Sequence, residues 1–343
     1  MNNAETITKA ISSSLSIIEQ EREREIISRR FGLNGQKETL EQIGEMLSIT
    51  RERVRQLEKA ILIRLRIAAE EGRITELAAA EKLIIRNLTE MGRIARTNQL
   101  AKKILGHEAK AIDKANFNFL GEISPALTII ADNDKYHGAI GIAEYGDEKT
   151  TRSRVDEIVA LVKANKAPMN IEELDAKLDY EHPSHIEAIA RLSKKLSTLN
   201  GQWGLTKWPT VNPKNIRDKI YVVLEEHKEP MHFSDIAQAI SASSFRRKNV
   251  TVQAIHNELI KDSRFVLIGR GIYALDSWGY EKGTVSDIIT KILKKAGDDG
   301  LSRKDIVKRV LKERKVKETT VLLNLQNKKL FVKAGKDNYK LAA

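Results

Sequence analysis

Four side chains between residues 51 and 56 have the types and the spacing to read DNA base pairs. They lie within "TRERVRQLE" and are Arg51, Glu52, Arg55 and Gln56. In the major groove Arg can donate two hydrogen bonds to guanine, Gln can pair with adenine, and Glu can accept from the cytosine amino group. On a helix these positions share one side with Lys59. The pattern is also typical of an ordinary charged helix with i,i+4 pairs, so both interpretations stay open.

The residues around this polar arc predict a helix-turn-helix. Thr39 is placed to cap a helix over Leu40 to Leu47, the tripeptide "SIT" makes the turn, and the next helix runs from Arg51 to Arg66. Three apolar residues of that second helix fall opposite the arc, namely Val54, Leu57 and Ile61. The arc therefore faces outward at the helix N-terminus, as in a recognition helix that enters a major groove.

Two stretches of the chain closely resemble region 4 of primary-type bacterial sigma factors: "REREIISRRFGL" and "TLEQIGEMLSITRERVRQLEKAILIRLR". That module recognises the minus 35 promoter element and touches the flap of RNA polymerase. The resemblance implies base-reading roles for Arg51, Glu52, Arg55 and Gln56. It implies DNA-backbone contacts for a second set, Thr39, Arg53 and Lys59. It also implies a polymerase-binding face around Ile26, Ile27 and Phe31.

The sequence departs from a whole sigma factor in two respects. Nothing in it resembles the aromatic-rich region 2 that melts the minus 10 element, and the sigma-like segment comes first instead of last. We therefore do not expect a complete, self-sufficient sigma factor.

One plan recurs along the chain: a helix, a short second helix, a third helix and then a hairpin. The clearest internal match is "KAPMNIEELDAKL" with "KEPMHFSDIAQAI", and Asn200 and Gly201 suit a tight hairpin turn. We predict a mainly α fold with small β wings, a tandem array of helix-turn-helix and winged-helix units. The predicted domains are 1–72, 74–146, 150–208, 213–280 and 283–343.

The segment from Asn215 to Trp278 resembles the HARE type of helix-turn-helix domain, through "EEHKEPMHFSDIA" and "RFVLIGRGIYAL". This domain occurs in the delta subunit of bacterial RNA polymerase and in some chromatin and restriction proteins. The resemblance implies docking on polymerase. Residues 217–282 are close to neutral, with ten Lys and Arg against nine Asp and Glu. Arg246 and Arg247 are expected to touch phosphates or an acidic polymerase surface, or to be a solvated helix entrance.

The last predicted domain is strongly basic, with sixteen Lys and Arg against seven Asp and Glu from residue 283 onward. Its third helix is predicted over Val316 to Lys329. Several lysines flank that helix and would contact the DNA backbone, namely Lys315, Lys317, Lys328 and Lys329. Phosphate contacts add salt-dependent affinity without sequence information, so we expect nonspecific duplex binding. A merely solubilising surface is the alternative.

The overall composition narrows the function classes. A formal charge of +12 favours an anionic partner, and the absence of Cys excludes disulfides, thiolate zinc sites and cysteine nucleophiles. No apolar run is long enough for a membrane span, and the polar start lacks a signal-peptide core. His182 and His185 have no second cluster to complete a metal site. We expect no enzyme activity, cofactor, metal or small-molecule substrate, and a location in the bacterial cytosol or nucleoid.

These observations predict a transcription initiation factor whose partners are double-stranded promoter DNA and the RNA polymerase core. Two alternatives remain from other classes. The first is a scaffold of tandem winged helices that binds proteins, with DNA contact incidental. The second is a chromosome-organising DNA binder that never meets polymerase.

Overall fold

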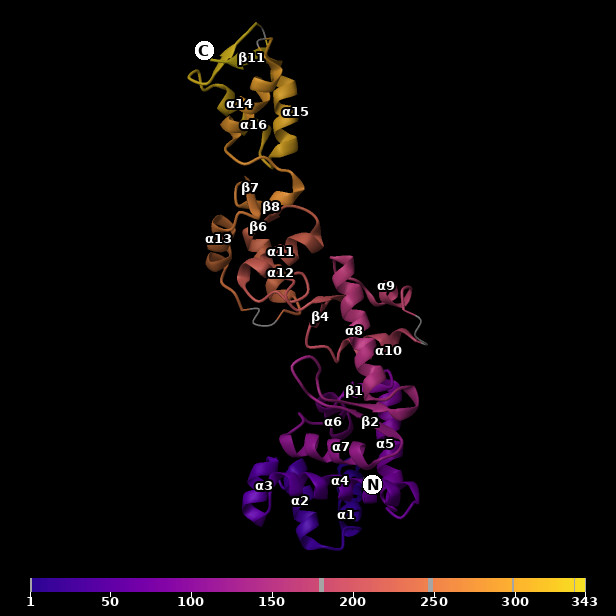
Figure 1. Ribbon diagram of the computed structural model, residues 1–343. Coiled ribbons are helices and arrows are strands. Elements are labelled where there is room, and N and C mark those ends of the chain that lie inside the picture. Colours follow the sequence, from indigo (N-terminus) through magenta and orange to yellow (C-terminus); the bar gives the residue numbers. More distant parts are fainter. Residues whose placement is uncertain (1, 179–181, 246–248, 298, 336, 343) are drawn as a thin grey trace. The chain divides into compact units, whose positions relative to one another are not determined.

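The structure is a computed structural model that describes residues 2–178, 182–245, 249–297, 299–335 and 337–342. Within these residues the chain forms sixteen α-helices and eleven short strands, which pair in small antiparallel sheets (Figure 1). The predicted class, mainly α with small β wings, is confirmed. The chain divides into two compact parts, residues 1–207 and 208–343. None of the described helices is both long and apolar enough to cross a membrane.

The first four helices contain the predicted helix-turn-helix. The second of them ends at Gly32, whose φ of 81° is left-handed and suits glycine, as predicted for a stop at this position. Its N-terminal neighbour is an additional helix that precedes the sigma-like segment. The four are α1 (Asn3–Ser16), α2 (Glu21–Phe31), α3 (Leu40–Leu47) and α4 (Arg51–Glu70).

The next group is a winged helix, with its three strands in the order β1-β3-β2. The stretch "LTIIADNDKYHGAIGIA" forms two antiparallel strands, as the sequence predicts, and Ile129 pairs with Ile140. The elements are α5 (Leu77–Glu90), β1 (Ile94–Arg96), α6 (Thr97–Leu105), α7 (Ala111–Ile123), β2 (Leu127–Ile130), β3 (Ala139–Ile142) and the 3-10 helix η1 (Ala143–Tyr145).

These two groups share one hydrophobic core. It runs without a break from Ile7 on α1, through Ile61 and Leu65 on α4, to Phe119 on α7 and Ile140 on β3. Burial of this apolar surface is what holds the two groups together. The predicted division at residues 72–74 therefore crosses a single core, and the five predicted domain ranges stay a prediction.

The third group repeats the plan with a two-stranded hairpin, β4 and β5. Asn200 and Gly201 have φ angles of 49° and 76°, so both central residues of the turn are left-handed, as the hairpin prediction requires. The elements are α8 (Glu148–Asn165), α9 (Ile171–Asp175), α10 (Pro183–Ala190), β4 (Leu196–Leu199) and β5 (Gln202–Leu205).

Residues 208–343 begin with the HARE-like group, whose strands have the order β6-β8-β7. Its internal match to the third group extends to the backbone, because Lys166 and Lys228 both end a helix in the left-handed region, at φ of 59° and 54°. The elements are α11 (Ile216–His227), β6 (Met231–His232), α12 (Phe233–Ala242), α13 (Val252–Lys261), β7 (Phe265–Gly269), β8 (Ile272–Leu275) and the 3-10 helix η2 (Asp276–Trp278).

The last group has strands in the order β10-β11-β9 and a shorter third helix than predicted. That helix ends at Leu325, and the side chain of Asn327 accepts a hydrogen bond from the Lys329 N–H at 3.1 Å. Such a local side-chain bond competes with helix continuation. The elements are α14 (Val285–Ala296), β9 (Leu301–Ser302), α15 (Arg303–Glu313), α16 (Glu318–Leu325), β10 (Phe331–Lys333) and β11 (Asn338–Leu341).

Candidate nucleic-acid interface

The turn between α3 and α4 is held by three local features. A Cβ at Gly44 would lie 2.7 Å from the Ile49 carbonyl oxygen, so only glycine fits there without a shift of the backbone. Ser48 takes the left-handed conformation, at φ of 55°, and reverses the chain. The Thr50 hydroxyl accepts a hydrogen bond from the Arg53 N–H at 3.2 Å and caps α4. These features fix the position of the first turn of α4.

Thr39 caps α3 in a reciprocal capping box with Gln42. Its hydroxyl oxygen accepts from the Gln42 N–H at 3.2 Å, and the Gln42 side chain accepts from the Thr39 N–H at 2.8 Å. Thr39 is exposed, and its hydroxyl proton is not used by the cap. The predicted contact to a DNA phosphate is therefore compatible with its structural role.

The two predicted faces of α4 are present. Val54 and Ile61 are buried and Leu57 is half-buried, so the apolar stripe rests on the core. Val54 closes a small cluster with Ile26 and Ile43 beneath the helix-turn-helix. All the predicted DNA-contacting residues of α4 are exposed together at its N-terminal end: Arg51, Glu52, Arg53, Arg55, Gln56 and Lys59.

Two polar pairs organise this exposed arc. Arg55 Nη2 lies 2.7 Å from Glu52 Oε1, and Arg53 donates to the side-chain oxygen of Gln56 at 3.4 Å. Hydrogen bonding to Arg55 lowers the pKa of Glu52, and the same bond raises the pKa of Arg55. Both groups are exposed, so the pair adds little to stability. Its consequence is that Arg55 must exchange Glu52 for a base when it reads DNA.

Replacing Glu52 with glutamine is expected to tighten binding to duplex of scrambled sequence, because the change removes an anion beside the phosphates and releases Arg55. Discrimination between a preferred and a scrambled duplex is expected to fall by about 1–3 kcal/mol, the usual worth of one base contact. Fluorescence anisotropy with both duplexes measures the two effects. Equal tightening on both would show that Glu52 reads no base.

The predicted polymerase-binding face is wrong in the structure. Ile26 and Ile27 are both 0% exposed. Phe31 is half-buried and stacks edge-to-face on Phe119, with ring centroids 5.3 Å apart. These three side chains belong to cores inside residues 1–207, because the chain supplies its own partners for them. They are not available for contact with another protein.

The partner that covers Phe31 is α7, the third helix of the second group, which occupies the position of a recognition helix in a winged helix. Phe117, Phe119 and Leu120 on α7 are all 0% exposed within the core shared with α1 and α4. The outer half of α4 is also bound to it, because Arg66 Nη2 lies 2.8 Å from Glu122 Oε1. Much of α7 is therefore buried inside the chain and braces α4.

The sequence contains one signal for this packing that our predictions did not use. Phe117, Phe119 and Ile123 sit close together on one short helix, more apolar surface than a small winged helix buries by itself. The identity of the covering helices depends on contacts between distant segments, which the sequence pattern does not give.

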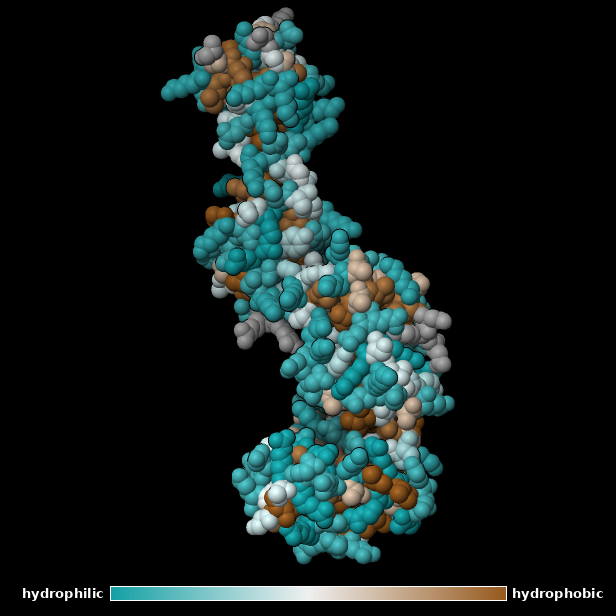
Figure 2. Space-filling view, viewed as in Figure 1, coloured by the Kyte–Doolittle hydropathy of each residue, from teal (hydrophilic) through white to brown (hydrophobic). Residues whose placement is uncertain are grey.

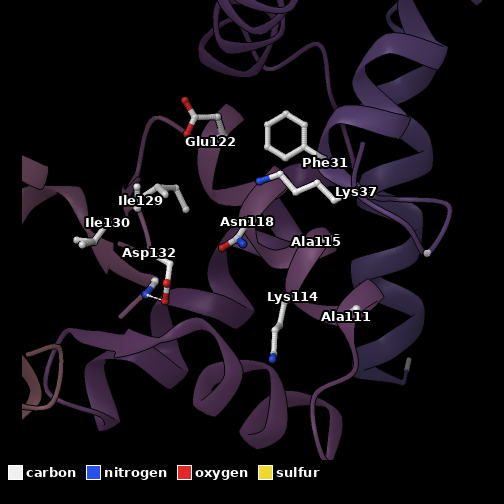
Figure 3. Close-up of a pocket in the computed structure, with 14 residues that line it drawn as sticks. Phe31, Lys37, Ala111, Lys114, Ala115, Asn118, Glu122, Ile129, Ile130 and Asp132 are labelled. Atoms are coloured by element: carbon white, nitrogen blue, oxygen red, sulfur yellow. Dashed lines mark hydrogen bonds between the residues drawn. The ribbon is translucent and has the colours of Figure 1, made fainter. Parts of the chain in front are cut away.

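A pocket of about 520 Å³ opens where the α2–α3 loop meets α7 and β2 (Figure 3). Its walls include Phe31 and Ile129, and Lys37 and Lys114 bring positive charge to it. Burial raises the pKa of Glu122 at its edge, and Arg66 opposes that shift. The pocket places Lys114 of the second group close to the sigma-like loop, a nearness that the sequence did not predict.

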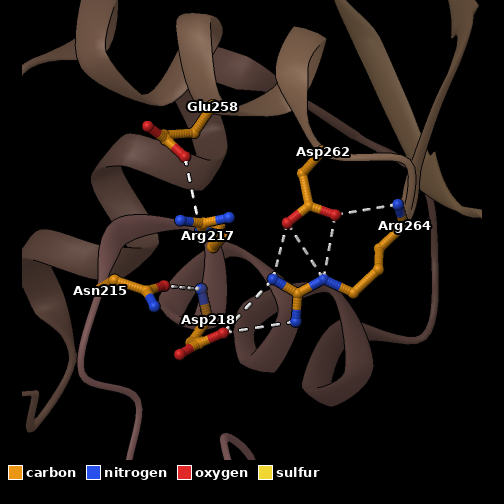
Figure 4. A network of polar contacts seen from close by, with 6 residues as sticks. All are labelled: Asn215, Arg217, Asp218, Glu258, Asp262 and Arg264. Carbon is orange, nitrogen blue, oxygen red and sulfur yellow. Dashed lines mark hydrogen bonds and ion pairs between the residues drawn. The ribbon is translucent and has the colours of Figure 1, made fainter.

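The HARE-like group satisfies its charges internally (Figure 4). Arg264 Nη2 lies 2.8 Å from Asp262 and 3.3 Å from Asp218, and Arg217 pairs with Glu258 at 3.8 Å. Hydrogen bonding to Arg264 lowers the pKa of Asp262. Two apolar side chains of α13 remain exposed, Val252 at 45% and Ile260 at 64%. The predicted contacts of Arg246 and Arg247 lie outside the described residues.

The last group exposes its predicted phosphate-binding lysines, Lys315, Lys317, Lys328 and Lys329. Its third helix α16 is itself poor in charge, and Leu323 is 66% exposed on it. Over this part of the chain, the face shown in Figure 2 is mostly hydrophilic, with hydrophobic patches between. Cations around an uncharged helix suit contact with the backbone better than base reading.

The histidine pair is structural. His182 caps α10, and the buried His185 donates from Nδ1 to the Gly92 carbonyl at 2.8 Å. Across the residues that the structure describes, no group of three or more His, Asp or Glu could hold a metal ion.

Two segments of the chain match known protein families. Residues 20–66 match the family described as Sigma-70, region 4, and residues 216–278 match HARE-HTH, a family whose description names the HTH domain of ASXL and restriction endonuclease proteins. Both predicted resemblances are confirmed. These helix-turn-helix families support a DNA-binding role in transcription that is related to RNA polymerase, and such domains are typical of proteins without enzyme activity.

A solved structure, described as the crystal structure of bacterial selenocysteine-specific elongation factor EF-Sec, is 13% identical to this chain. The alignment has a TM-score of 0.21 and covers 75% of this chain and 37% of that one. At this score the likeness carries no argument about fold or function.

Proposed function

We propose that this protein is a transcription initiation factor that reads a minus 35 type promoter element through α4. Arg51, Glu52, Arg55 and Gln56 read base edges. A second set contacts the flanking phosphates, Thr39, Arg53 and Lys59. The HARE-like group docks on the RNA polymerase core, and the basic last group holds duplex beside the element.

One observation carries this proposal. The exposed polar arc of α4 lies at the N-terminal end of the second helix of a helix-turn-helix, inside the segment that resembles sigma region 4. A recognition helix contacts base edges with its N-terminal residues. The proposed action is positioning of polymerase at a site, which requires no bond-making chemistry, and a separate factor would melt the promoter.

The decisive experiment compares Arg55→Ala and Gln56→Ala with the wild-type chain. The preferred duplex is first selected from a randomised pool, and a scrambled duplex of equal length serves as the reference. Each substitution is expected to weaken binding to the selected duplex by about 1–3 kcal/mol and to leave the scrambled duplex nearly unchanged.

Lys59→Ala is the matched control on the same helix. As a phosphate contact it is expected to weaken both duplexes alike and to reduce the salt slope by about 1. If Arg55→Ala or Gln56→Ala also weakened both duplexes equally, the residue would be a backbone contact, and its base-reading role would be excluded.

A protein-interaction scaffold is the second candidate, favoured by the internally paired charges and the exposed Val252 and Ile260 of the HARE-like group. Capture of polymerase from nuclease-treated cytosol tests it. Polymerase retained without DNA, together with no footprint at any promoter, would favour the scaffold. A genome-wide occupancy map spread evenly over the chromosome would instead indicate a chromosome-organising protein.

A further inference from the structure

The HARE-like group and the basic last group are joined by main-chain pairing. The Lys315 N–H donates to the Ile268 carbonyl at 2.9 Å, and Lys315 forms a parallel bridge with Gly269, so this segment lines the edge of β7. A Cβ at Gly269 would lie 2.5 Å from the Lys315 carbonyl oxygen. The close approach therefore requires glycine at this position.

Arg314 fastens this joint. Its side chain is 3% exposed, and its guanidinium donates to three main-chain carbonyls, those of Leu267, Glu281 at 2.8 Å and Gly283. These acceptors lie on β7 and in the connection between the two groups. Burial lowers the pKa of Arg314. A buried guanidinium that bridges three segments is costly to desolvate, so it holds them in one geometry only while all its acceptors stay in place.

The joint brings exposed cations from both groups together. Arg270, at the tip of the β7–β8 hairpin, follows Gly269 directly, and strand and Cα spacings put its Cα within about 9 Å of that of Lys315. Lys317 lies two residues further and precedes α16. All three are exposed, and their side chains form no ion pair with any residue that the structure describes. Two carboxylates are close along the chain: Glu313, which accepts from the Glu281 N–H at 3.4 Å, and Glu318.

We propose that Arg270, Lys315 and Lys317 form one phosphate-binding surface for duplex DNA across the two groups, positioned by Arg314. The proposal rests on the proposed backbone-holding role of the last group and adds the hairpin of the HARE-like group to it. It gives that group a second contact, to nucleic acid, beside its proposed docking on polymerase.

The surface is tested by the salt dependence of full-chain binding to a scrambled duplex. Arg270→Ala is expected to reduce the slope of log Kobs against log salt by about 0.9, the value for one lost phosphate contact. Lys214→Ala removes one exposed charge outside this surface and is expected to leave the slope unchanged. Equal slopes for the two variants would overturn the proposal. So would a loss of polymerase retention in nuclease-treated cytosol with the slope intact, which would identify a protein-binding surface.

The positioning role of Arg314 needs a separate readout. Because the chain has no Cys, spin labels at Glu229→Cys and Lys304→Cys report the distance between the two groups without interference. We expect a narrow distance distribution that broadens in Arg314→Ala. We also expect the effects of Arg270→Ala and Arg314→Ala on DNA affinity to be non-additive. Additive effects, or an unchanged distribution, would remove Arg314 from the proposal.

Arg314→Lys serves if Arg314→Ala fails to fold by circular dichroism, because Lys keeps the charge but lacks the planar fork that bridges several carbonyls. It is expected to fold and to broaden the distance distribution, and a narrow one would exclude the positioning role. None of these measurements uses the selected duplex. Their failure would leave base reading by α4 intact, and a failure of base reading would leave the salt slopes as expected.

Discussion

Phe119→Ala is expected to lower the free energy of unfolding of the N-terminal part by about 3–5 kcal/mol, the usual cost of removing a buried phenyl ring. Phe119 is 0% exposed and contacts Phe31 edge-to-face, so the change leaves a cavity and breaks an aromatic pair. Urea unfolding of the full chain, followed by circular dichroism, measures the loss. Affinity for the selected duplex is expected to fall as well, because α7 braces α4.

Ile112→Ala is the control for this change. Ile112 lies on the same helix α7 but is 37% exposed, so its truncation should cost far less. If both variants lost the same stability, the packing of α7 on the sigma-like helices would not occur in solution. A destabilised Phe119→Ala that still bound the selected duplex normally would show that α4 needs no brace.

Gly92→Ala is expected to cost about 2–5 kcal/mol, for two physical reasons. Gly92 has a φ of +87°, where an alanine is strained by about 1–3 kcal/mol. Its new Cβ would also lie 2.3 Å from the Ser184 carbonyl oxygen, a backbone atom that cannot move aside cheaply. The same Gly92 carbonyl accepts the hydrogen bond from His185, so the change disturbs the contact between α10 and the second group.

Gly106→Ala separates the two causes. Gly106 has a similar φ of +77°, but no atom lies within 4 Å of the added Cβ. Its substitution should therefore show the backbone strain alone, and thermal melts of both variants give the difference. A Gly92→Ala chain as stable as Gly106→Ala would mean that Ser184 is not in close contact with Gly92.

The features that the sequence predicted well depend on local physics. The arc and stripe of α4 follow from helical periodicity within a few turns, and the Asn200–Gly201 turn follows from the φ angles that these two residues tolerate. The capping of α3 by Thr39 is equally local. Each of these depends on residues a few positions apart, whose relation is nearly the same in any fold.

Prediction failed where the outcome depended on distant segments. Ile26 and Ile27 looked suitable for a partner protein, but the chain buries them itself. Arg314 looked like one cation among many in a basic tail, yet it is enclosed by carbonyls from β7 and the connecting segment. An amphipathic face states that it must be covered, and the sequence pattern does not state by what.

The sequence by itself determined the class of the protein: a chain of helix-turn-helix units with an exposed base-reading arc on residues 51–59 and a basic C-terminal end. Periodicity, caps and charge are short-range properties, so they can be read residue by residue. Only the tertiary structure decided that α7 is buried against α1 and α4, and that Arg270 lies beside Lys315. Those pairings are chosen by the total apolar surface buried and hydrogen bonds satisfied across the fold, which no single segment contains.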